Sequence, residues 1–224
     1  CLSPSAVDKI SERAWSCSSI ILGPGIGRSA AVAEFQEAFL ERTKAPLLID
    51  ADGLFNISTT TSFSGRQVIL TPHEGEAGRL CSVDSKTIRA DRQRWVRRLA
   101  LQRGATVVLK GAYSECGDPS GRVYINPTGN AGMATAGSGD VLAGIIGCFL
   151  AQMSDDSLHA AALGTYVHGL AGDMVSQRSS QRSLVATDLI KQLPEVFARL
   201  EKVEPADGVA YPETIAEDGI SIIR

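Results

Sequence analysis

Residue types that suit phosphate binding and proton transfer gather in one glycine-rich segment, residues 126–144. Gly137, Ser138 and Gly139 stand directly before Asp140, and an apolar helical pattern begins at Asp140 or Val141. Small residues leave backbone N–H groups unobstructed, and a helix N-terminus adds positive potential, so this turn predicts a phosphate site. Asp140 stands where a hydroxyl and a phosphoryl group would meet, which makes it a candidate general base for phosphoryl transfer.

Two known phosphate-binding motifs do not match this chain. Ser138 stands where the lysine of a P-loop would be, and Arg28 replaces the third glycine of a dinucleotide fingerprint in the turn 23–27. That turn either reverses the chain or lets a ligand approach the backbone closely. Asp140 has an alternative role as a helix N-cap, but an N-cap does not require three small residues before it, which favours the functional interpretation.

Strands and helices that alternate along the chain must position these residues. Alternation predicts an α/β fold with a mostly parallel sheet and helices on both faces. Ligands bind beyond the carboxyl ends of such strands, and Asp50, Asp52, His73 and Lys110 all follow predicted strands. The alternative is that these residues occur there only because loops are rich in polar and turn residues, but this explains their presence at every predicted strand end less well.

The individual elements follow from apolar runs, capping residues and turn residues. We expect strands at 20–22, 47–49, 68–70, 107–109 and 220–223, a hairpin around 117–121, and helices after Ser29, over 88–103 ending at Gly104, over 157–177 and over 187–201, where Pro194 should kink or shorten the last helix.

Composition narrows the class of protein. The chain has 224 residues, a net charge of −3 and no basic stripe with interleaved aromatic residues, so nucleic acid is not expected as a partner. No apolar run is long enough to span a membrane, and no signal-peptide pattern is present. The five cysteines, an odd number without a C-x-x-C pair, predict free thiols in a reducing cytoplasm; they are Cys1, Cys17, Cys81, Cys116 and Cys148. No metal-ligand set is apparent among them.

The segment 126–144 closely resembles the ADP/ATP-dependent NAD(P)H-hydrate dehydratases. The resemblance covers about residues 18–200, with further matching segments at 22–28, 49–53, 70–76, 108–111, 168–173 and 188–190. It implies a ribokinase-like fold and a repair reaction in which ADP or ATP phosphorylates the hydroxyl of hydrated NADH or NADPH (NADHX, NADPHX). Phosphate then leaves and the double bond returns.

The resemblance also implies roles for particular residues. Gly27, His73 and Asp140 would contact the hydrate, Asp140 would act as base, and Mg²⁺ would bridge phosphates. The adenine nucleotide would be held by Lys110, Gly111, Ala112, Tyr113 and Ser114 together with Gly137, Ser138 and Gly139. The segments 71–76 and 126–130 look bacterial, which favours ADP. A homo-oligomer, a tetramer in this family, is expected.

Three departures from the family pattern matter. Ser114 replaces the usual threonine but keeps its hydroxyl. Phe55 interrupts the Asp-Ala-Leu-Asn pattern that is usual in the family, so Asn56 is left out of the predicted site. The family also has a longer βαβ region before the turn at Gly23, so we expect a fragment that tends to self-associate. We assign residues 1–203 to one domain and 204–224 to an acidic tail. The alternatives are a ribokinase-like small-molecule kinase and a non-catalytic nucleotide-binding fragment.

Overall fold

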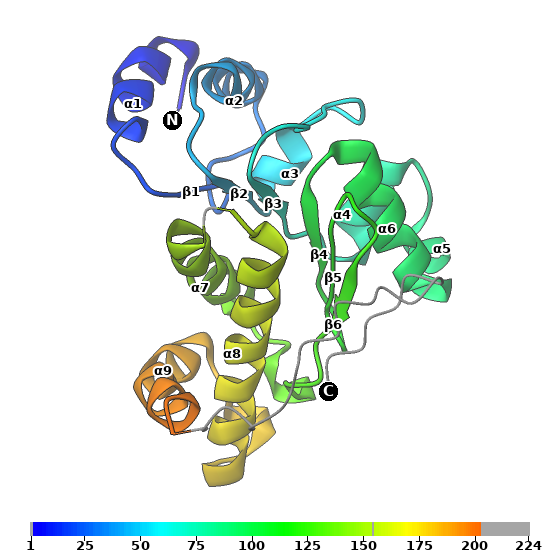
Figure 1. The fold of residues 1–224 in the computed structure, drawn as a ribbon, viewed down its shortest axis with the longest axis vertical. Coiled ribbons are helices and arrows are strands. Elements are labelled where there is room, and N and C mark those ends of the chain that lie inside the picture. The colour runs from blue at the N-terminus through cyan, green and yellow to red at the C-terminus, as the bar shows by residue number, and fades with distance from the viewer. Residues whose placement is uncertain (1, 154, 203–224) are drawn as a thin grey trace.

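A single six-stranded sheet forms the centre of the protein. The structure, a computed structural model, describes residues 2–153 and 155–202; the predicted strand 220–223 and the tail 204–224 lie outside them. The strands lie side by side in chain order (Figure 1): β1 Ile20–Leu22, β2 Leu47–Ile49, β3 Val68–Leu70, β4 Thr106–Leu109, β5 Glu115–Gly117 and β6 Val123–Ile125. β1 to β4 pair in parallel and the β5–β6 hairpin is antiparallel, which confirms a mostly parallel sheet.

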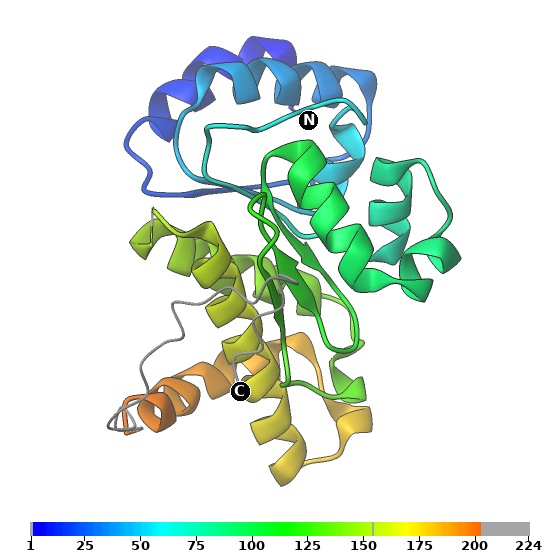
Figure 2. The ribbon, with the colours of Figure 1, turned by 45° about the vertical axis from the view of Figure 1, so that its right-hand side comes forward.

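Helices cover both faces of this sheet, as Figures 1 and 2 show. One layer contains α1 Val7–Ala14, α2 Ala30–Arg42, α3 Asp52–Asn56, α4 Glu74–Cys81, α5 Ser85–Ala90 and α6 Arg92–Arg103. The other contains α7 Ser138–Gln152, α8 Ser157–Arg178 and α9 Ala186–Leu200. Short 3₁₀ turns occur at Pro4–Ala6, Ala131–Met133 and Gln181–Ser183.

Every residue of the central strands β2, β3 and β4 is buried. Leu47 and Ile49 pack into the core under α2 and α6, while Leu48 packs into a separate core under α7 and α8. Continuous apolar runs of this kind are typical of parallel strands covered on both faces. The sheet is therefore a rigid platform whose strand ends hold the loops described below.

Some of the local predictions are confirmed and others need correction. Ser29 caps α2 by accepting a hydrogen bond from the Val32 N–H, and Gly104 ends α6 in the left-handed conformation. The predicted helix 88–103 is instead two helices, α5 and α6, because the Asp91 backbone leaves helical geometry and its side chain caps α6.

The two other corrections concern α7 and α9. α7 begins at Ser138, and Gly137 (φ 83°) is its N-cap, so Asp140 is the third helical residue rather than the cap. Pro194 does not shorten α9, which continues to Leu200, because its apolar face packs into the core through Leu189 and Val196 and outweighs the lost backbone hydrogen bond.

The described residues also bear on the predictions about cysteines and membrane spans. Cys17, Cys81, Cys116 and Cys148 are free thiols, and Cys1 lies outside the described part. Within residues 2–153 and 155–202, no helix combines the length and hydropathy needed to cross a bilayer.

Candidate functional site

The carboxyl ends of the parallel strands bring several predicted site residues to one edge of the sheet. Asp50 follows β2, His73 follows β3 and Lys110 follows β4. His73 and Lys110 form an isolated parallel bridge, and the Lys110 N–H donates to the Pro72 carbonyl over 2.8 Å. The structure therefore brings His73 and Lys110 together, although they are far apart in sequence.

The glycine turn after β1 is held tightly against α3. A Cβ on Gly23, whose φ is 131°, would lie 1.8 Å from the Asp50 carbonyl oxygen, so this position requires glycine. The Gly27 N–H donates to Asp52 Oδ2 (3.0 Å), and the Gly27 carbonyl accepts from Asn56 Nδ2 (3.0 Å). Both backbone polar groups of Gly27 are thus occupied. A Cβ on it would meet nothing within 4 Å, so its Cα faces open space.

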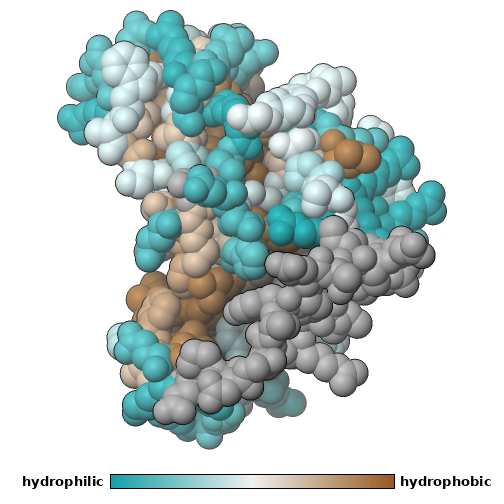
Figure 3. All heavy atoms as spheres, viewed as in Figure 1, coloured by the Kyte–Doolittle hydropathy of each residue, from teal (hydrophilic) through white to brown (hydrophobic). Residues whose placement is uncertain are grey.

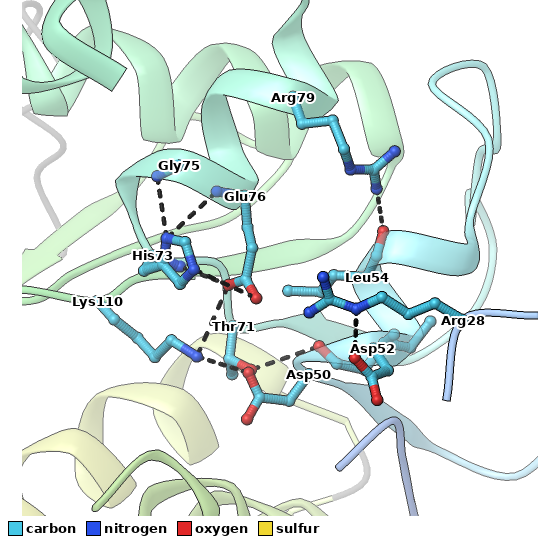
Figure 4. A network of polar contacts seen from close by, with 11 residues as sticks. Arg28, Asp50, Asp52, Leu54, Thr71, His73, Gly75, Glu76, Arg79 and Lys110 are labelled. Atoms are coloured by element: carbon cyan, nitrogen blue, oxygen red, sulfur yellow. Dashed lines mark hydrogen bonds and ion pairs between the residues drawn. The ribbon is translucent and has the colours of Figure 1, made fainter. Parts of the chain in front are cut away.

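Lys110 is the centre of a charged network (Figure 4). Its Nζ lies 2.6 Å from Asp50 Oδ1 and 3.9 Å from Glu76 Oε2. Asp50 is only 2% exposed, so its carboxylate depends on this ammonium group. Lys110 Nζ also lies 3.9 Å from the position of a Cβ on Gly139. The lysine therefore connects the sheet edge to the first turn of α7, as the predicted nucleotide site requires.

His73 has a structural role beside its predicted one. Its Nδ1 accepts hydrogen bonds from the N–H groups of Gly75 (3.0 Å) and Glu76 (3.3 Å), and Glu76 Oε2 accepts from the His73 N–H (2.9 Å). This reciprocal arrangement caps α4. Because Nδ1 is an acceptor, the ring proton sits on Nε2, and the side chain is 60% exposed. Nε2 lies 3.5 Å from Glu76 Oε1, so a ligand that accepts this proton would compete with that carboxylate.

The predicted nucleotide loop, residues 110–114, is a compact turn. Ser114 Oγ accepts from the Gly111 N–H (3.3 Å) and donates to the Gly111 carbonyl (3.1 Å). Arg92 Nη2 donates a hydrogen bond to the carbonyl of Leu109, the residue directly before this loop (2.8 Å). Tyr113 is 70% exposed and has φ 53°, a left-handed conformation that is costly for a tyrosine. The hydroxyl of Ser114 therefore shapes this turn.

α8 fixes the loop that leads into α7. Asp173 accepts from the Gly129 N–H (2.8 Å) and from Asn130 Nδ2 (3.0 Å), and Thr128 Oγ1 donates to the Tyr166 carbonyl (2.9 Å). These hydrogen bonds satisfy polar groups of the loop and hold it against α8. Asp173 was not predicted as a site residue, although it lies in the matching segment 168–173.

His168 supports the start of α7 from within the core. Its Nε2 lies 3.3 Å from Ser138 Oγ, and the residue is 8% exposed. Burial lowers the pKa of His168 to about 4, although a hydrogen bond with Ser138 acts in the opposite direction. The ring is therefore neutral at ordinary pH and pairs with a hydroxyl rather than with an anion.

Asp140 stands apart from this network. It is exposed in the first turn of α7, and no described residue forms a hydrogen bond or ion pair with its carboxylate. The helix dipole favours an anion there. A carboxylate without a partner is able to accept a proton from a bound hydroxyl.

The Mg²⁺ that the resemblance implies would need phosphate oxygens of a bound nucleotide as additional ligands at this edge of the sheet. Within residues 2–153 and 155–202, no group of three or more His, Cys, Asp or Glu side chains could hold a metal ion. Asp50 and Glu76 supply oxygen atoms of the type Mg²⁺ prefers, but both lie against the Lys110 ammonium group. Magnesium is commonly held by few carboxylates together with substrate phosphates, and this donor set suits that arrangement.

The fold and the site define a ribokinase-like protein. A ribokinase-like superfamily protein from Enterococcus faecalis superimposes with a TM-score of 0.74 at 27% identity, covering 88% of this chain and 68% of that one. The family model described as NAD(P)H-hydrate dehydratase matches residues 3–195, and the chain belongs to this family.

Two other relatives are similar to this chain. The bifunctional NAD(P)H-hydrate repair enzyme Nnr of Moorella thermoacetica is 41% identical over 204 residues, which cover 90% of this chain and 38% of the Moorella protein. The ADP/ATP-dependent NAD(P)H-hydrate dehydratase of Bacillus subtilis, co-crystallised with ATP/Mg²⁺, superimposes with a TM-score of 0.74 at 29% identity, covering 84% of this chain and 69% of that one. The chain thus spans well under half of the Moorella enzyme.

Proposed function

We propose that this chain catalyses the ADP- or ATP-dependent dehydration of NADHX and NADPHX. Membership of the family supports this activity, and one observation carries it: the Lys110 ammonium group lies beside Gly139 in the first turn of α7. A cation next to a glycine-rich helix start is a favourable position for the transferred phosphoryl group.

The adenine nucleotide lies across two loops in this proposal. Lys110 and the N–H groups of Gly137, Ser138 and Gly139 hold its phosphates. The turn formed by Gly111, Ala112, Tyr113 and Ser114 holds the rest of the nucleotide. Mg²⁺, when bound, neutralises phosphate charge. ADP remains our preferred phosphoryl donor.

The hydrate lies on the other side of the phosphates. His73 donates from Nε2, the open Cα face of Gly27 allows close approach, and Asp140 contacts the hydroxyl that reacts. Asp140 removes the hydroxyl proton as the oxygen attacks the terminal phosphoryl group. The C–O bond then breaks and phosphate leaves, the adjacent ring carbon loses a proton to water, and the ring double bond is restored. Because Asp140 has no partner among the described residues, no ion pair must break first.

The cellular setting belongs to the same proposal. Four free thiols among the described residues suit a cytoplasmic enzyme.

Figure 3 shows hydrophobic residues gathered toward the α9 side, and Ile190 and Phe197 of α9 are 52% and 39% exposed. This apolar surface supports a homo-oligomer of one-domain chains (residues 1–203), with a tetramer as the specific expectation.

The deciding experiment incubates the protein with NADHX and ADP or ATP and follows the absorbance of reduced nicotinamide. Recovery that requires both nucleotide and protein supports the proposal. A stable phosphorylated product without recovery would identify a small-molecule kinase instead. Nucleotide binding without turnover of either hydrate would identify a non-catalytic nucleotide-binding protein.

A further inference from the structure

Two arginines from different elements share one aromatic ring beside the glycine turn. Arg28 follows Gly27, and its Cζ lies 4.8 Å from the ring centroid of Phe55 in α3. Arg79 projects from α4, and its Cζ lies 5.4 Å from the same centroid. Figure 4 shows the two guanidinium groups extending toward the same region from opposite sides. Phe55 thus serves as a platform for two cations.

Each of the two arginines also interacts with an acidic residue, Arg28 with Asp52 and Arg79 with Glu76. Burial lowers the pKa of Arg79, and the nearby charge of Arg28 lowers it further, although Glu76 acts in the opposite direction. Arg28 uses Nε to donate to Asp52 Oδ1 (2.5 Å), and Arg79 donates to the Leu54 carbonyl. Because both guanidinium groups contact the same ring, an anion that binds beside Phe55 would interact favourably with both of them.

Donor groups remain for such an anion. The terminal amino groups of Arg28 have no hydrogen-bond partner among the described residues, and its side chain is 56% exposed. A guanidinium presents its N–H groups as a planar fork that matches phosphate oxygens. Since Phe55 and the hydrogen bonds to Asp52 and the Leu54 carbonyl already restrict these side chains, little side-chain freedom is lost on binding.

The position beside Gly27 is informative. A Cβ on Gly25 or Gly27 would meet nothing within 4 Å, so a ligand has room over the turn. Lys110 lies on the other side of the acidic pair Asp50 and Glu76. In the proposed reaction two phosphorylated molecules bind side by side, and the lysine and the arginine pair offer each of them a cationic group.

We propose that Arg28 and Arg79, mounted on Phe55, form a binding site for a phosphoryl group of the dinucleotide substrate. This inference rests on the proposed function, because the dinucleotide is the hydrate described above. The phosphoryl group has two sources: the pyrophosphate common to NADHX and NADPHX, and the additional phosphate of NADPHX.

The test measures binding by calorimetry, with NADH and NADPH, the products of the proposed reaction, as probes. Arg28→Gln keeps a donor for Asp52 but loses the charge and the fork, and Arg28→Lys keeps the charge alone. Arg178→Gln is the matched control, because Arg178 is 60% exposed and pairs with a single carboxylate, Glu195. The melting temperature of Arg28→Gln should change little, since exposed ion pairs contribute little stability.

We expect Arg28→Gln to weaken binding about tenfold or more, with Arg28→Lys between it and the wild type and Arg178→Gln unchanged. A loss for NADPH alone identifies the additional phosphate, and equal losses for both probes identify the pyrophosphate. ADP affinity should not change. Unchanged affinity for both probes, an equal loss in Arg178→Gln, or no binding by the wild type would overturn the inference. If binding depends on Arg28 but hydrate is not converted, only the proposed function fails.

Discussion

The Lys110 ammonium group lies 2.6 Å from Oδ1 of Asp50, a carboxylate that is 2% exposed. Asp50 directly follows β2 and Lys110 directly follows β4, and β3 lies between these two strands in the sheet. Lys110 thereby stabilises a buried charge and also presents its ammonium group to the start of α7. Lys110 therefore stabilises the fold and also belongs to the proposed nucleotide site, and mutation can separate these two roles.

Replacing Lys110 with methionine should destabilise the protein by about 3–5 kcal/mol, because Asp50 is left buried without its cation. The double variant Lys110→Met/Asp50→Asn should recover much of this loss, since no unpaired charge remains. Neither variant should bind ADP normally. Urea denaturation and ADP titration measure the two effects. Wild-type ADP affinity in the double variant would remove Lys110 from the nucleotide site.

His168 should make stability depend on pH. Burial lowers its pKa to about 4 from 6.5, so between these values the unfolded chain binds a proton that the folded chain does not. Stability therefore falls as pH drops from about 6.5 to about 4, by up to about 3 kcal/mol from this residue. Denaturation at several pH values should show a shallower acid slope for His168→Gln than for the wild type. Equal slopes would contradict this explanation.

Much of the fold followed from the sequence because its signals are local. The apolar runs 20–22, 47–49 and 68–70 are strands, and the turn around Gly117 to Gly121 joins the predicted hairpin. The errors at Asp91 and Pro194 have a different origin. One depends on a capping side chain and the other on packing of α9, and apolar periodicity reports neither of them.

The site was harder to predict because its supporting contacts join distant segments. Asn56 was left out of the predicted site because Phe55 interrupts the family pattern there. In the structure the Asn56 amide donates to the Gly27 carbonyl. The Phe55 ring in turn contacts the guanidinium groups of Arg28 and Arg79. His168 and Asp173 reach the α7 loop from another helix. Spacing shows which residues follow strands, but the partner of each side chain depends on tertiary structure.

Two glycines of α7 offer a paired test of the phosphate site. Gly144 is exposed, and a Cβ there would meet nothing within 4 Å, whereas a Cβ on Gly139 would lie 3.9 Å from Lys110 Nζ. Alanine should preserve stability at both positions, or raise it by up to about 1 kcal/mol, because glycine is a poor helix former. Only Gly139→Ala should weaken ADP binding, since its methyl group enters the proposed phosphate site. Equal ADP affinity in both variants would argue against that site.

Asp140→Asn separates catalysis from helix stabilisation. The change removes one negative charge from the first turn of α7, which should cost only about 0.3–1 kcal/mol. Asparagine cannot accept a proton at neutral pH, so turnover of NADHX should fall about 10²–10⁴-fold. ADP binding should persist or tighten, because Gly137 to Gly139 keep their N–H groups and a carboxylate near the phosphates is lost. Asp188→Asn is the matched control, because Asp188 is also the third residue of its helix, α9, and it should lose stability without losing rate. Near-wild-type turnover by Asp140→Asn would show that Asp140 only stabilises the helix.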